Sequence, residues 1–305
     1  MTNEYIPVKK SQVAFLKNIS LYHFSKTKEP QVYKKKGSSL NQSKFKSDRY
    51  PELFINNSDK KEASEELLDN LNLSLAKTIS TKGFVKMKSI LGDIVNEALN
   101  ESFGNSLNKL PETLEILFNG YKENHSMLES LTLINTSNPF LIDHTVNVLS
   151  LTMQYCFFQN FSDSDIKKMG LCAILHDIGL TEVPQEILET QDKLTDNQFK
   201  QMQTHCIKGY KLIQKRATFE KEISQVAMDH HEKLDGSGYP SGKTTISSEA
   251  SLIGMIDCYE YLAYREKNFR PVKDPFGSLQ ILKMDVMEKQ YDKEIFIGFC
   301  RCLTR

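Results

Sequence analysis

Five of the seven histidines in this 305-residue chain lie between residues 144 and 231, three of them in two short motifs. The first motif is His176-Asp177-Ile178-Gly179, and the second runs from His230-His231-Glu232 to Tyr239-Pro240. Further imidazole and carboxylate candidates are His144, His205 and Asp257. A single buried histidine is more often a hydrogen-bonded core residue, but this clustering predicts a metal centre.

The candidate ligands fall one group to each expected helix. Ligands on facing helices of a bundle converge on one place, so one centre can gather them. Neighbours such as His176 and Asp177 project about 100 degrees apart on a helix, so one pair can reach two metals. Imidazole and carboxylate donors without thiolate favour iron, manganese or zinc over a structural zinc–cysteine site.

Charge and cysteine content exclude several other classes. The 39 basic and 39 acidic side chains cancel, which argues against binding to duplex nucleic acid or to an anionic membrane surface. The six cysteines form no C-x-x-C pair and are typical of a reducing compartment. The sequence shows neither a signal peptide nor an apolar run of roughly 18 residues, and we expect a cytoplasmic protein.

The periodicity of apolar residues divides the chain. Short β-favouring runs at 12–16, 20–24, 31–33 and 52–55 predict a small N-terminal sheet. Helical spacing begins near residue 60, and nearly everything after 139 has it. We therefore predict a mainly α chain with two parts. A small α+β accessory region over 1–118, regulatory or dimerising, precedes an all-α domain over 119–305. The helices expected in that domain are 143–158, 163–179, 195–216, 219–231, 248–264, 277–289 and 293–303.

The two motifs resemble those of HD-GYP domains, a subset of the HD phosphohydrolase superfamily. The resemblance covers about residues 139–270 and includes both signatures in the expected order. It implies an all-α domain that hydrolyses the second messenger cyclic di-GMP to linear pGpG, to GMP or to both. It also implies a dinuclear metal centre with a bridging hydroxide, iron being the family's commonest metal and manganese the alternative.

The resemblance also implies roles for individual residues. Asp177 is the catalytic bridge between two metal sites. The first site comprises His144, His176, Asp177 and Asp257. The second comprises Asp177, His205, His230 and His231. The loop residues placed beside the active site, and implicated in contacts with GGDEF partner domains, are Asp235, Gly236, Gly238, Tyr239 and Pro240. A homodimer is a further expectation.

Three positions and one segment depart from the family's usual pattern, the segment being Glu260 to Tyr264, where D-A-L-T-S is usual. Leu180 stands where a phosphate-contacting lysine is usual, and Asn147 where an arginine is usual. Phe140 replaces a glutamate that binds a third metal in some members, so we expect two metals. The cations that could replace the usual substrate-binding arginine are Arg265, Lys267 and Arg270.

Three functional hypotheses follow from these departures. The first is a working cyclic di-GMP phosphodiesterase, weakened by the missing lysine. The second is a metal-bearing signalling module that binds cyclic di-GMP or a GGDEF-type partner with little turnover. The third is an HD hydrolase that acts on another nucleotide.

Overall fold

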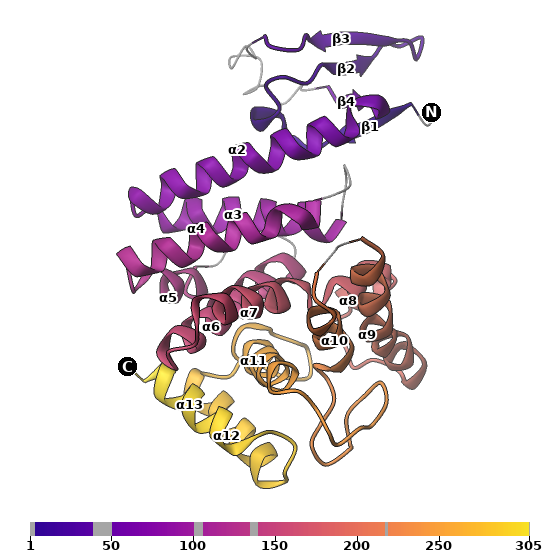
Figure 1. Ribbon diagram of the computed structural model, residues 1–305. Coiled ribbons are helices and arrows are strands. Elements are labelled where there is room, and N and C mark those ends of the chain that lie inside the picture. The colour runs from indigo at the N-terminus through magenta and orange to yellow at the C-terminus, as the bar shows by residue number, and fades with distance from the viewer. Residues whose placement is uncertain (1–3, 39–50, 101–105, 135–139, 217–218, 305) are drawn as a thin grey trace.

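The computed structural model describes residues 4–38, 51–100, 106–134, 140–216 and 219–304. A small sheet lies at one end of the molecule, and layers of helices follow it toward the C-terminal half (Figure 1). This confirms the prediction of a mainly α chain with a small N-terminal sheet. No helix in these ranges has the length and apolar character needed to cross a lipid bilayer.

The sheet is antiparallel, with strand order β1-β4-β2-β3. Its strands are β1 (Tyr5–Val8), β2 (Leu21–Phe24), β3 (Pro30–Lys34) and β4 (Leu53–Asn56). Three of the four expected strands are confirmed. The strand expected at 12–16 is wrong, because Val13–Phe15 forms a 3₁₀ turn, η1. The Gln12 side chain accepts from the backbone N–H of Lys9 and donates to Glu97, which stabilises this turn. Strand β1 was not predicted.

Helices connect the sheet to the rest of the molecule. The short 3₁₀ turn η2 (Asn57–Asp59) follows β4. The next elements are α2 (Lys60–Ser80), α3 (Phe84–Asn100), η3 (Ser106–Lys109), α4 (Leu110–Glu123) and α5 (Met127–Thr132). Helix α3 packs on α2 and on α6 (Phe140–Phe158), and α4 packs on α7 (Asp163–Leu175). One apolar core runs from Val8 in the sheet to Cys302 near the C-terminus.

The division predicted at residue 118 falls inside helix α4. Because α4 contacts both α2 and α7, it belongs to the packing of both parts. The separation into two domains stays a prediction.

The C-terminal half is helical, as predicted. Helix α9 (Asp196–Arg216) begins with the expected capping box, in which Thr195 and Gln198 each accept from the other's backbone N–H. The helix expected over 163–179 ends at Leu175. The remaining elements are η4 (Ile178–Glu182), α8 (Gln185–Glu189), α9 (Asp196–Arg216), α10 (Lys221–Asp229), α11 (Ser248–Tyr264), α12 (Pro275–Met287) and α13 (Lys293–Leu303).

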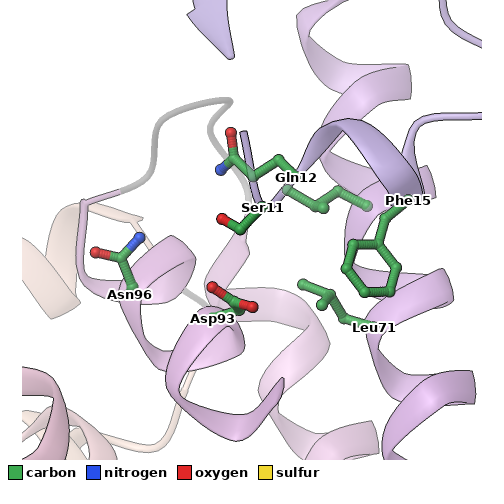
Figure 2. Close-up of a pocket in the computed structure, with 7 residues that line it drawn as sticks. Ser11, Gln12, Phe15, Leu71, Asp93 and Asn96 are labelled. Carbon is green, nitrogen blue, oxygen red and sulfur yellow. The ribbon is translucent and has the colours of Figure 1, made fainter. Parts of the chain in front are cut away.

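A small pocket lies between η1, α2 and α3 (Figure 2). Asp93 lines it together with polar side chains such as Ser11 and Asn96. Burial raises the pKa of Asp93. All residues that line this pocket belong to the N-terminal part, so it is separate from the predicted histidine centre.

Two glycines let the backbones of the C-terminal elements approach closely. A Cβ on Gly179 in η4 would lie 1.9 Å from the carbonyl oxygen of His205, and a Cβ on Gly254 in α11 would lie 1.9 Å from that of His230. Neither site can hold a side chain without moving a backbone. These contacts set how near η4 lies to α9, and α11 to the end of α10.

We predict that Gly254→Ala destabilises the chain by about 1–3 kcal/mol or more, because the added methyl group collides with backbone that cannot give way. Urea unfolding followed by circular dichroism measures the loss. Ser248→Ala, at an exposed position in the first turn of the same helix, is the control. Equal unfolding midpoints for Gly254→Ala and the parent chain would contradict this account.

Candidate metal centre

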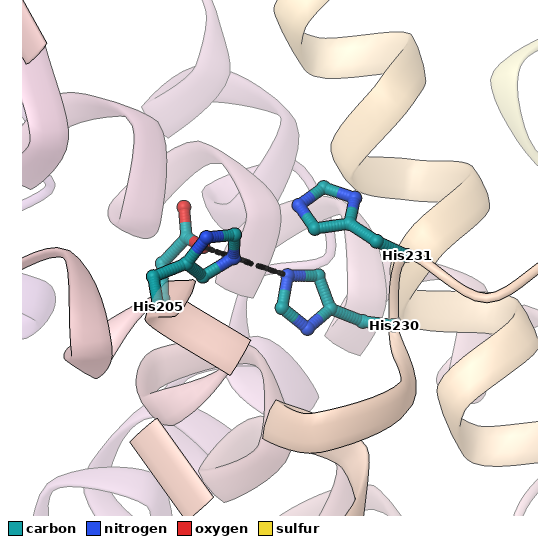
Figure 3. A group of neighbouring side chains, drawn as sticks. His205, His230 and His231 are labelled. Atoms are coloured by element: carbon teal, nitrogen blue, oxygen red, sulfur yellow. Dashed lines mark hydrogen bonds and ion pairs between the residues drawn. The ribbon is translucent and has the colours of Figure 1, made fainter. Parts of the chain in front are cut away.

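The structure brings all seven predicted metal-binding residues together. They come from α6, from the ends of α7 and α10, and from α9 and α11. They form two groups that share Asp177, and within each group one donor atom per residue lies within 4.8 Å of the others. The groups are His144, His176, Asp177 and Asp257, and Asp177, His205, His230 and His231. Figure 3 shows the three histidines of the second group turned toward one another.

The carboxylate of Asp177 lies between the two groups. Its Oδ2 is 3.6 Å from His144 Nε2 and 3.5 Å from His176 Nε2. Its Oδ1 is 3.3 Å from His205 Nε2 and 3.5 Å from His230 Nε2. Each oxygen therefore faces a different pair of imidazoles, which is the geometry that a bridging ligand requires.

Backbone carbonyls orient three of the imidazoles. Nδ1 of His176 donates to Ala173 O at 2.8 Å, and Nδ1 of His205 donates to Met202 O at 2.7 Å. Nδ1 of His230 lies 3.1 Å from the carbonyl of Ala227. Because a carbonyl only accepts, Nδ1 carries the proton in each ring. Each Nε2 then presents a lone pair toward Asp177, as in a metal-ligating histidine.

Several of these donor atoms lack a hydrogen-bonding partner. Nε2 of His205 and Nε2 of His230 face each other at 3.3 Å with lone pairs on both. Among the described residues, the buried Nε2 of His176 and Oδ1 of Asp177 have no hydrogen-bond partner. Unsatisfied buried polar atoms are costly. A cation in each group would satisfy these atoms, so the donor set fits two metal ions.

A side chain, not a backbone carbonyl, orients His144. Its Nδ1 donates to Glu260 Oε2 at 2.5 Å, and its Nε2 lies 3.2 Å from Asp257 Oδ1. Burial opposes protonation, but Glu260, Asp177 and Asp257 outweigh it and raise the pKa of His144. The imidazoles around Asp177 likewise outweigh burial and hold the pKa of that carboxyl well below its usual range.

The predicted motif loop closes over one side of the second group. The ring centroid of Tyr239 lies 4.6 Å from that of His231, and the backbone N–H of Tyr239 donates to the His231 carbonyl. Glu232 accepts from the backbone N–H groups of Ser241 and Lys243 and so ties the loop ends together.

Each remaining residue of the motif loop has a defined backbone role. Asp235 accepts from the N–H of Ser237. Gly236 adopts a φ of 82°, and a Cβ on Gly238 would lie 2.4 Å from His231 O. The peptide before Pro240 is cis. Contact of this loop with a partner protein stays a prediction.

The three predicted substrate-binding cations differ in their surroundings. Arg270 donates to the carbonyls of Tyr261, Leu262 and Arg265 near the end of α11. Lys267 donates to the Thr190 carbonyl, and burial together with Arg265 and Arg270 lowers its pKa to about 8.

Arg265 is linked to the candidate metal centre by its contacts. It donates to Leu188 O and stacks 3.7 Å above the Phe140 ring, which in turn stacks on His144. Its charge interacts with Asp177 and Glu260. Through Phe140 and through its charge, Arg265 therefore interacts with two of the predicted metal ligands, His144 and Asp177.

The departures from the family pattern are also visible in the structure. Leu180 is half-buried in η4, where its N–H donates to the carbonyl of Asp177. Asn147 is buried on α6 and donates to Glu260 Oε1 at 2.7 Å. It also accepts from Lys88, on α3, at 2.9 Å.

Sequence reasoning missed Glu260 and Lys88. Glu260 follows Asp257 by three residues and so shares its helix face, a spacing that could have identified it. Lys88 is separated from Asn147 by 59 positions, and nothing in the local sequence connects them.

Comparisons with known proteins agree with this geometry. The model of the HD domain family matches residues 130–295, which is more than half of the chain. A protein named cyclic di-GMP phosphodiesterase PA4108, from Pseudomonas aeruginosa, is 28% identical over 179 residues, which cover 58% of this chain and 42% of that protein. A cyclic di-GMP phosphodiesterase of Thermotoga maritima is 25% identical over 230 residues, 71% of this chain and 61% of that protein. The chain thus spans less than two thirds of these relatives.

A further relative has a different named substrate. The 3'3'-cGAMP-specific phosphodiesterase 3 of Vibrio cholerae is 28% identical over 174 residues, 56% of this chain and 37% of that protein. Among solved structures, Bd1817, a HDG"Y"P protein from Bdellovibrio bacteriovorus, aligns with a TM-score of 0.66 over 99% of this chain and all of that one, at 16% identity. That likeness shows a shared fold. Together with the family match, it confirms the resemblance drawn from the two motifs: the chain belongs to the HD domain family.

Proposed function

We propose that this chain is a metal-dependent phosphodiesterase that hydrolyses cyclic di-GMP to linear pGpG, to GMP or to both. The observation that carries the proposal is Asp177, whose two oxygens face the lone pairs of separate imidazole pairs. The names of the Pseudomonas and Thermotoga relatives support the choice of substrate. We further propose two metal ions, with iron as the metal and manganese as the alternative.

Two bound cations would lower the pKa of a water molecule between them and neutralise the phosphate it attacks, without a protein nucleophile. His144, His176 and Asp257 would hold the first ion, and His205, His230 and His231 the second. Asp177 would bridge the two. The buried position of these donors excludes bulk water, so their charges act through a medium of low dielectric constant.

Arg265 is our candidate for contact with a substrate phosphate. It is the cation that interacts electrostatically with Asp177, and its guanidinium is stacked on Phe140 in a fixed orientation. Lys267 and Arg270, like Arg265, donate to backbone carbonyls. In our proposal they support the 261–270 segment that carries Arg265.

A specific observation keeps the second hypothesis open. Leu180 offers no positive charge, and all three substitute cations donate to backbone carbonyls. A weakly active signalling module that binds cyclic di-GMP, or a GGDEF partner through residues 235–240, would retain the metal donors and lose transition-state stabilisation. Homodimer formation also stays a prediction.

We predict that the purified chain binds about two equivalents of transition metal and that Asp177→Ala lowers this number sharply, since the shared donor is removed. Elemental analysis by mass spectrometry gives the metal content. Asp163→Ala, which removes an exposed carboxylate at the start of α7, is the matched control. Full metal retention by Asp177→Ala would refute the bridging assignment.

We predict turnover of cyclic di-GMP by protein loaded anaerobically with ferrous iron, or with manganese, and a loss of at least about 100-fold in Asp177→Ala. Chromatography of the products separates pGpG from GMP. Running 3'3'-cGAMP beside cyclic di-GMP tests the third hypothesis directly. Two bound metals without turnover of either dinucleotide would favour the signalling module.

We predict that Leu180→Lys raises kcat/KM or binding affinity for cyclic di-GMP by about tenfold or more, because it supplies a cation near the phosphate. Leu73→Lys, which adds the same charge at an exposed position of α2, is the control. Equal gains in both variants would point to a general charge effect, and no gain in either would mean that another residue already supplies this contact.

A further inference from the structure

We infer that Lys88, which lies outside the matched HD region, is a positioning residue for His144 and thereby sets the metal affinity of the first group. The inference rests on the proposed dinuclear function. A series of hydrogen bonds joins side chains of three helices, α3, α6 and α11. Lys88 Nζ donates to Asn147 Oδ1 at 2.9 Å, Asn147 Nδ2 donates to Glu260 Oε1 at 2.7 Å, and Glu260 Oε2 accepts from His144 Nδ1 at 2.5 Å.

All four side chains in this hydrogen-bonded series are buried. Lys88 is 1% exposed, Glu260 1%, His144 3% and Asn147 4%. A buried polar group that loses its partner is not rescued by water, so each hydrogen bond constrains the next. A change at Lys88, at the far end of this series of hydrogen bonds, can therefore alter the orientation of the His144 imidazole.

The ammonium group determines which way the Asn147 amide points. Lysine donates and never accepts, so the Asn147 oxygen must face Lys88 and its NH₂ group must face Glu260. Without Lys88, the amide is free to flip and present its oxygen to the Glu260 carboxylate, where two acceptors repel each other. Lys88 thus specifies the hydrogen bond that holds Glu260.

Lys88 also places a positive charge near a buried carboxylate. Burial lowers the pKa of Lys88, while the charges of Asp143 and Glu260 act in the opposite direction. Arg265 also interacts electrostatically with Glu260. Lys88 makes a second hydrogen bond, to the Ile134 carbonyl at 2.5 Å, which anchors the ammonium between α3 and the end of α5.

His144 differs from three other imidazoles in needing this support. His176, His205 and His230 direct Nδ1 to carbonyls of their own helices. His144 directs Nδ1 to Glu260, 116 positions away in the sequence. A change at Lys88 should therefore affect the first group more than the second, where His205 and His230 are held by carbonyls of their own helices.

The test uses the full chain and Mn²⁺ as the probe. We expect Lys88→Met to weaken Mn²⁺ binding at one of two sites by about 10–100-fold, the loss typical of removing a partner of a metal ligand. Equilibrium dialysis measures both affinities, and electron paramagnetic resonance shows whether one ion or an adjacent pair is bound. Lys88→Arg, which keeps the charge and the donors, should recover most of the loss. Lys86→Met, an exposed lysine on the same helix, is the control.

A second variant decides the matter if Lys88→Met does not fold. Asn147→Asp keeps a partner for Lys88 but removes the N–H that Glu260 accepts, and we expect the same selective loss at one site. Unchanged Mn²⁺ affinities in both variants, or equal losses at both sites, would overturn the inference while leaving the proposed function intact. A parent chain that binds no Mn²⁺ would overturn both.

Discussion

Each carboxylate oxygen of Asp177 faces a different pair of imidazoles, and the packing of the C-terminal half makes that arrangement achievable. Asp177 follows the end of α7, while its partners come from α6, α9 and α10. Those segments must pack directly against one another for a single aspartate side chain to reach all of them. Gly179 and Gly254 permit this, because each brings a backbone against the carbonyl of a histidine in the second group.

Four of the five imidazoles of this centre are oriented by two different means. A carbonyl three residues earlier on the same helix is available wherever the helix forms, so three rings gain their orientation locally. His144 depends on Glu260, which reaches it from α11. Local orientation survives rearrangement of the neighbours, whereas orientation by a distant carboxylate depends on the whole α6–α11 interface.

The motifs, together with the family resemblance, were sufficient to predict which seven residues the structure brings together. His176, Asp177, His230 and His231 sit in contiguous signatures, so their association is visible in the sequence itself. The helices follow from apolar periodicity and from caps such as Thr195. The contact between Lys88 and Asn147 could not be predicted, since it depends on how α3 packs against α6 and no local pattern records that packing. The turn at Val13–Phe15 was mistaken for a strand because short apolar runs suit either structure.

The continuous core has a consequence for how the N-terminal sheet can influence the centre. Helix α3 packs directly on α6, and α4 on α7, so apolar side chains join the two halves along whole helices. Opening about a hinge would expose this core to water. If the sheet regulates the centre, as the sequence predicts, the signal would have to pass through small sliding movements of packed helices, in the manner of a shear mechanism, and the Asn147 amide lies at the interface that would slide.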